Sequence, residues 1–127
     1  MPVTSLSLLV LRTAKIDACR EFYQGLGLAM VEEKHGKGPV HYSSSSSGIT
    51  VEIYPETQKN FTESKAERNL RLGFMVESLA ATSESLEALG STVLNPPSIT
   101  QWGRLAVVLD PDGREVEISE PLKINEE

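Results

Sequence analysis

Apolar and polar residues alternate along parts of the chain with the period of two that a β-strand imposes. In the segment 48–54, Val51 and Ile53 point to one side, while Glu52 and Tyr54 point to the other. Further apolar or alternating segments predict strands at about 8–13, 28–36, 39–46, 71–76, 92–97, 103–109 and 114–119. Most of these strands are therefore expected to bury one face and to leave a mixed face on the other side.

Two segments follow the helical period instead. The first has an apolar stripe and ends at Gly27, which is the expected left-handed cap. The second begins after Ser78, a plausible N-cap, and ends at Gly90. The predicted apolar stripes consist of Ile16, Cys19, Phe22, Tyr23 and Leu26 in the first helix, and of Leu79, Ser83, Leu86 and Leu89 in the second.

The chain repeats itself. The pattern G-x-x-V-E-I occurs at 48–53 and again at 113–118, which is 65 positions later. Leu-Gly at 26–27 recurs at 89–90, 63 positions later. Self-similarity of this kind indicates duplicated structural units. We expect an α+β fold of two βαβββ modules.

The modules are expected to span residues 4–55 and 69–120 and to be joined by a polar linker, 56–68. Together they are expected to form one domain over 1–127.

Composition narrows the functional class. The 127 residues carry 12 Lys and Arg against 18 Asp and Glu, which gives a net charge of −6. This charge argues against nucleic-acid and anionic-membrane partners, because both attract cationic surfaces. A single cysteine excludes an internal disulfide, and no apolar run approaches the length of a membrane span. No export signal is recognised, so we expect a cytoplasmic protein.

The mixed faces of the strands are the candidate binding surface. The purely apolar faces should pack against the helices, which leaves Glu52, Glu117 and their neighbours to line a concave cleft between sheets. A cleft with a few polar groups among apolar ones is a typical small-molecule site.

These features resemble the vicinal oxygen chelate superfamily. The resemblance is carried by the paired modules, by Phe-Tyr followed by Gly-Leu-Gly-Leu in the first helix region, and by Trp-Gly…Asp-Pro-Asp-Gly-x-x-Val-Glu-Ile near the C-terminus. The superfamily includes glyoxalase I, extradiol dioxygenases, fosfomycin-resistance enzymes and bleomycin-resistance binding proteins. The resemblance implies the fold, over residues 5–120, but not the chemistry, because one fold hosts many functions.

Enzymes of this superfamily bind a divalent metal through four strand positions, which correspond here to Leu8, Glu52, Arg71 and Glu117. Leu8 has no donor atom, and Arg71 is a permanent cation that cannot coordinate a metal. We therefore expect no metal and no cofactor at these positions. Arg71 is expected to contact Glu52 or Glu117 and to supply the missing positive charge.

A substitute metal ligand from His35 or His41 is the alternative that the residues leave open.

Other residues are assigned to the cleft by position. Tyr54 shares the face of Glu52, and Trp102 is a candidate aromatic wall as well as a candidate core residue. Either His41 or Tyr42 faces the cleft. The predicted ligand-binding residues are thus Glu52, Tyr54, Arg71, Trp102 and Glu117, with no catalytic residue assigned.

The function implied by this resemblance is that of a metal-free binding protein, which sequesters a small aromatic or cationic compound in the cleft. The alternatives are a metal-dependent lyase, isomerase, transferase or dioxygenase of the same superfamily, and a metal-free enzyme that uses Glu52 or Glu117 as its base. By the same resemblance we expect a homodimer, with the cleft either within one chain or shared between two.

Overall fold

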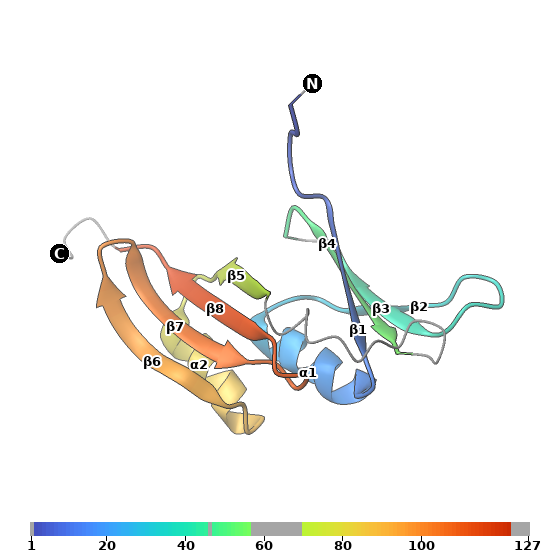
Figure 1. Ribbon diagram of the computed structural model, residues 1–127. Coiled ribbons are helices and arrows are strands. Elements are labelled where there is room, and N and C mark those ends of the chain that lie inside the picture. The colour runs from blue at the N-terminus through green and yellow to red at the C-terminus, as the bar shows by residue number, and fades with distance from the viewer. Residues whose placement is uncertain (1, 46, 57–69, 123–127) are drawn as a thin grey trace.

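The computed structural model describes residues 2–45, 47–56 and 70–122, and it contains two βαβββ modules (Figure 1). Except for Glu56, the predicted linker lies outside the described residues. The first module consists of β1 (Leu8–Thr13), α1 (Ile16–Leu26), β2 (Val31–Glu33), β3 (His41–Ser44) and β4 (Thr50–Pro55). The second consists of β5 (Arg71–Met75), α2 (Leu79–Ala88), β6 (Val93–Thr100), β7 (Gly103–Leu109) and β8 (Glu115–Glu120).

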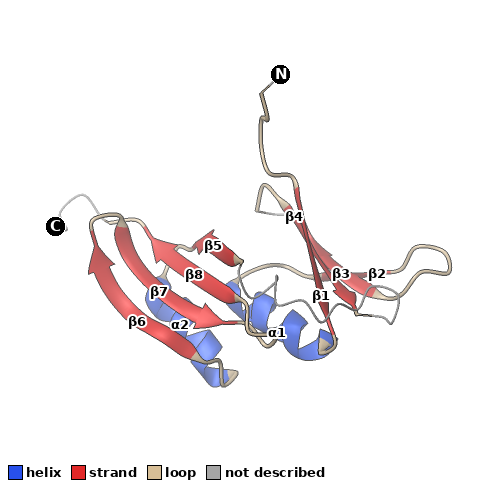
Figure 2. Ribbon diagram, viewed as in Figure 1, coloured by secondary structure: helices blue, strands red, loops and turns tan. Residues whose placement is uncertain are grey.

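Each module forms its own four-stranded mixed sheet. Sheet A has the strand order β1-β4-β3-β2, and sheet B has the equivalent order β5-β8-β7-β6. The first strand of each module pairs in parallel with the last, and the other pairings are antiparallel. Figure 2 shows the two sheets splayed on either side of the helices. The predicted α+β fold of tandem βαβββ modules is confirmed.

The helices end where the sequence predicts. Gly27 follows α1 with a φ of 119°, a conformation that only glycine adopts without strain. The Ser78 hydroxyl accepts a hydrogen bond from the Ala81 amide at 3.1 Å and so caps α2. None of the helices in the described part of the chain is long and apolar enough to cross a membrane.

The apolar faces of both sheets and both helices form one hydrophobic core. Residues of the two modules, such as Phe22 and Val51 in the first and Leu86 and Val116 in the second, belong to the same cluster. Leu89, predicted as part of the α2 stripe, is 48% exposed instead. The residues that bury the core-facing side of this short helix are Leu79 and Leu86. Since the helix-side faces share one core, the opposite faces of the two sheets point away from it.

A buried polar network also joins the modules. Arg114, 1% exposed, forms an ion pair of 3.0 Å with Asp110, which in turn accepts a hydrogen bond of 2.7 Å from Tyr23 on α1. Arg114 also donates to the backbone carbonyl of Arg12 at the end of β1. The Asp-Pro-Asp-Gly segment is therefore a structural turn whose first carboxylate is neutralised by an arginine.

Candidate functional site

The face of sheet A that points away from the helices carries an acidic and aromatic cluster. Glu52 on β4 pairs in register with Ser43, and Glu33 on β2 pairs with His41. These residues therefore share one face of the sheet, whereas Tyr42 pairs with the core residue Ile53 on the other. Of the two candidates left open by the sequence, His41 is the one on the mixed face.

His41 lies at the centre of this cluster. It is 1% exposed, and its Nε2 atom lies 3.4 Å from Glu33 Oε1 and 3.9 Å from Glu52 Oε2. Tyr54 stacks on the His41 ring with centroids 4.1 Å apart and planes within 8° of parallel. Partial desolvation, followed by the negative charges of Glu52 and Glu33, raises the pKa of Tyr54, so the phenol stays neutral at physiological pH.

The equivalent face of sheet B carries Arg71. Its guanidinium contacts Glu115 Oε1 at 2.6 Å and Glu117 Oε1 at 3.6 Å. The hydrogen bond to Glu115 and the charge of that carboxylate raise the pKa of Arg71 further. The arginine side chain is 52% exposed, so this is an ion-pair cluster at the surface rather than a buried one. The predicted contact of Arg71 with Glu117 is present, but Glu115 is the closer partner.

The structure places the predicted site residues in two groups. Glu52 and Tyr54 lie on sheet A, while Arg71 and Glu117 lie on sheet B. Among the described residues, no hydrogen bond or ion pair joins one group to the other.

Trp102 lies apart from both groups, at the turn between β6 and β7, where it is 77% exposed.

The four positions that correspond to the superfamily's metal ligands do not suit a metal in this chain. Leu8 and Glu52 lie on sheet A, and Leu8 offers no donor atom. Arg71 is a cation already engaged by Glu115 and Glu117, and its charge would repel a divalent ion. These residues therefore do not form a metal centre of the superfamily's kind.

An apolar groove of about 520 Å³ lies where β5 meets the beginnings of β1 and β4. Its apolar lining includes Leu9, Ile49, Phe74 and Met75, and Arg71 contributes a positive charge. The groove adjoins the sheet B group and is large enough for a small organic molecule.

Two acidic residues of these clusters were not assigned to a site from the sequence. Glu33 lies on a strand whose alternation is short and weak, and Glu115 shares its strand with Glu117. The signal for Glu115 was available, because residues two apart on a strand share a face. For Glu33, the available signal was Glu-x-His at 33–35, which places two potential ligands on one side of an extended segment.

Residues 6–123 match the family described as the glyoxalase-like domain. The chain therefore belongs to this family, and with it to the vicinal oxygen chelate superfamily. No protein of curated function matches the sequence.

Solved structures share this fold over nearly the whole chain. TnmS3, an antibiotic binding protein from Streptomyces sp. CB03234, is 19% identical with a TM-score of 0.71, over 96% of this chain and 99% of the other. A glyoxalase/bleomycin resistance protein/dioxygenase family enzyme from Burkholderia phytofirmans PsJN is 21% identical with a TM-score of 0.70, over 94% and 100%. A glyoxalase-related enzyme from Fulvimarina pelagi is 21% identical with a TM-score of 0.71, over 98% and 96%. Identities this low establish the fold and leave the function open.

Proposed function

We propose that this protein is a small-molecule binding protein of the glyoxalase/bleomycin-resistance type, which sequesters a small aromatic or cationic compound. The proposed ligand-contacting residues are Glu52 and Tyr54 on sheet A and Arg71 and Glu117 on sheet B. Trp102 is proposed as an additional aromatic contact. In this proposal no metal occupies Leu8, Glu52, Arg71 and Glu117.

The observation that carries the proposal is the asymmetry of charge between the two faces. On sheet B, Arg71 lies beside Glu115 and Glu117 and offsets part of their charge. On sheet A, the ion pairs of Glu33 and Glu52 within the described residues are with histidines alone. Because neither histidine is a permanent cation as Arg71 is, the sheet A face favours a cationic ligand, and Tyr54 offers it an aromatic surface.

The comparison with an antibiotic binding protein supports the binding class. TnmS3 has the same fold at a similar chain length, which makes ligand sequestration a function that this architecture can serve without further domains.

We further propose that the protein is a homodimer and that each cleft is shared. Glu52 and Glu117 lie on different sheets whose outer faces point away from a common core, which favours a cleft completed by a second chain. A second copy can place its sheet B opposite sheet A of the first. Exposed apolar side chains, among them Leu8 at 49% and Met75 at 73%, would gain cover in such a pairing.

The binding proposal is tested by calorimetric titration with matched panels of cationic and anionic aromatic compounds. We expect at least one cation to bind, and Glu52→Gln to weaken its binding by about tenfold or more, which corresponds to roughly 1.4 kcal/mol. Glu84→Gln, on the exposed side of α2, is the matched control and should bind like the parent. Preference for anions, or equal binding by Glu52→Gln and the parent, would contradict the proposal.

Complementation tests the shared cleft separately. Glu52→Gln and Glu117→Gln are each expected to bind poorly alone. After the two variants are mixed, unfolded and refolded together, a mixed dimer would contain one cleft with both parental residues. One of the two clefts in each mixed dimer should then bind normally. If the cleft lies within one chain, every cleft retains one substitution, and mixing restores nothing.

A further inference from the structure

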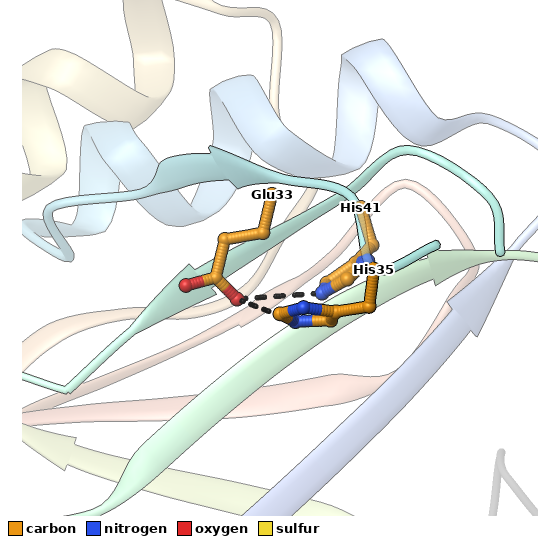
Figure 3. Close-up of side chains that lie close together, drawn as sticks. All are labelled: Glu33, His35 and His41. Atoms are coloured by element: carbon orange, nitrogen blue, oxygen red, sulfur yellow. Dashed lines mark ion pairs between the residues drawn. The ribbon is translucent and has the colours of Figure 1, made fainter. Parts of the chain in front are cut away.

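The strongest unassigned feature is a group of two histidines and a glutamate on sheet A (Figure 3). Glu33 ends β2, His35 follows it in the connecting loop, and His41 begins β3. One ligand atom from each residue lies within 4.8 Å of the others. We propose that Glu33, His35 and His41 bind a divalent first-row transition metal ion of the zinc class.

The fold brings these three residues together by strand register. Glu33 and His41 are direct partners in the antiparallel pairing of β2 with β3. His35 returns over this pair because the chain turns at Gly36, whose φ is 57°, and because the Gly38 amide donates to the His35 carbonyl at 2.9 Å. Figure 3 shows the Glu33 carboxylate pointing toward the two imidazole rings, with one ion pair drawn to each.

The distances fit a metal centre. Glu33 Oε1 lies 3.4 Å from His41 Nε2 and 3.6 Å from His35 Nε2. Ligands at zinc bond lengths of about 2.0–2.1 Å in tetrahedral geometry lie about 3.3 Å from one another. The His35 side chain is 73% exposed and therefore free to adjust its position toward a bound ion.

His41 is prepared to act as a ligand through Nε2. Its Nδ1 atom lies 3.2 Å from the Pro39 carbonyl oxygen, which can only accept, so Nδ1 carries the hydrogen. The Nε2 atom is buried and has no hydrogen-bond partner among the described residues. A hydrogen bond from the other ring nitrogen to a backbone carbonyl is a usual support of a metal-binding histidine. Here Tyr54 also holds the ring plane by stacking on it.

A cation at this point also resolves an electrostatic conflict. In a neutral ring, the Nε2 lone pair faces the carboxylate oxygens of Glu33 and Glu52, so three acceptors point at one another. A divalent ion bound by two neutral imidazoles would balance the two carboxylates. Imidazole nitrogens select zinc, copper, nickel or iron over magnesium and calcium, which prefer oxygen ligands.

This site is separate from the superfamily's four metal positions. Its ligands lie on β2, β3 and the loop between them, whereas those positions lie on the first and last strands of the modules. Glu52 is one of those four positions, and its carboxylate also lies 3.9 Å from His41 Nε2. The proposal goes beyond small-molecule binding and does not depend on it. Because a bound metal ion would offset the charge of Glu33 and Glu52, the cation-binding face of the proposed function is that of the metal-free protein.

The test is a competition titration of tag-free protein with Zn²⁺ against a chromophoric chelator, together with the visible absorption spectrum of the Co²⁺-loaded protein. We expect one equivalent of Zn²⁺ to bind and Co²⁺ to show the intense bands of tetrahedral coordination. His35→Ala is the primary variant because its side chain is 73% exposed and the fold does not need it. His35→Ala and Glu33→Gln should each weaken binding by at least about tenfold.

Glu32→Gln is the matched control, since Glu32 is the exposed neighbour that pairs with Tyr42 on the other face of the strand. It should bind Zn²⁺ like the parent. The proposal is overturned if the parent binds no stoichiometric Zn²⁺. It is equally overturned if His35→Ala and Glu33→Gln bind as tightly as the parent and Glu32→Gln.

Discussion

Replacing Arg114 should destabilise the protein more than replacing any exposed arginine. Its side chain is 1% exposed, and that of its partner Asp110 is fully buried. Arg114→Met retains an apolar stem of comparable length but leaves the Asp110 carboxylate without its counter-charge. Removal of one partner of a buried ion pair costs about 3–5 kcal/mol.

The remaining contacts of Asp110 place the expected loss near the lower end of that range. Its oxygens still accept hydrogen bonds from the Tyr23 hydroxyl and from the backbone amides of Asp112 and of residue 114. We therefore expect the free energy of unfolding to fall by about 3 kcal/mol in Arg114→Met. Tyr23→Phe, which removes one hydrogen bond to the same carboxylate, should cost about 1.5–3 kcal/mol.

Urea denaturation followed by circular dichroism measures these losses, provided that the slopes of parent and variants agree. Arg71→Ala is the matched control, because it removes the same charge from a pair whose arginine is 52% exposed. Its unfolding midpoint should stay close to that of the parent. A loss below about 1 kcal/mol in Arg114→Met would refute the reasoning, since it would mean that Asp110 needs no counter-charge.

Four further outcomes are expected. Burial, reinforced by the nearby aspartates, raises the pKa of the Cys19 thiol from 9.0 to about 12. The native protein should therefore resist iodoacetamide at pH 8, whereas urea-unfolded protein should react. Rapid labelling of the native protein would contradict this. Because the unfolded thiol loses its proton near pH 9 and the folded one does not, the free energy of unfolding should also fall as the pH rises from 9 towards 12. Gly103→Ala should destabilise more than Gly27→Ala in thermal denaturation. Both positions have positive φ, but only at position 103 would the added Cβ meet a backbone oxygen, that of Glu120. Equal losses would mean that strain in φ alone decides. Trp102→Ala should leave the melting temperature nearly unchanged, because the indole is 77% exposed.

The duplicated pattern in the sequence predicted the fold because both modules obey the same local rules. The alternation in 48–54 assigned Val51 and Ile53 to the core, and both are fully buried. Gly27 and Ser78 marked helix ends through requirements on φ and on capping that are local to the chain. The least accurate element was β2, predicted at 28–36 and observed as Val31–Glu33, since a short edge strand has little alternation to read.

The pairing of candidate residues could be predicted only in part. Arg71 and Glu117 contact each other as expected, because their strands are neighbours in one sheet. Glu52 belongs to the other sheet, and whether two sheets face each other depends on how the modules pack, which no periodicity encodes. The helices meet in one core between the modules, where Gly25 lies close to Leu86 and Leu89.

The same limitation explains why the sequence did not identify the neighbours of Glu52. From the repeat, Glu52 was compared with Glu117, its equivalent in the other module, although the atoms that surround it come from β2 and β3 of its own module. Within the described residues the second module has no counterpart of this cluster, because Thr100 and Gly103 take the places of Glu33 and His41 in the equivalent pairing of β6 with β7. A duplicated fold keeps its core symmetrical, because both copies must bury the same faces. Its outer faces are free to diverge, so residues present in one module alone are the better guide to chemistry. By that criterion, Glu33, His35 and His41 distinguish the first module, and Arg71 with Glu115 distinguishes the second.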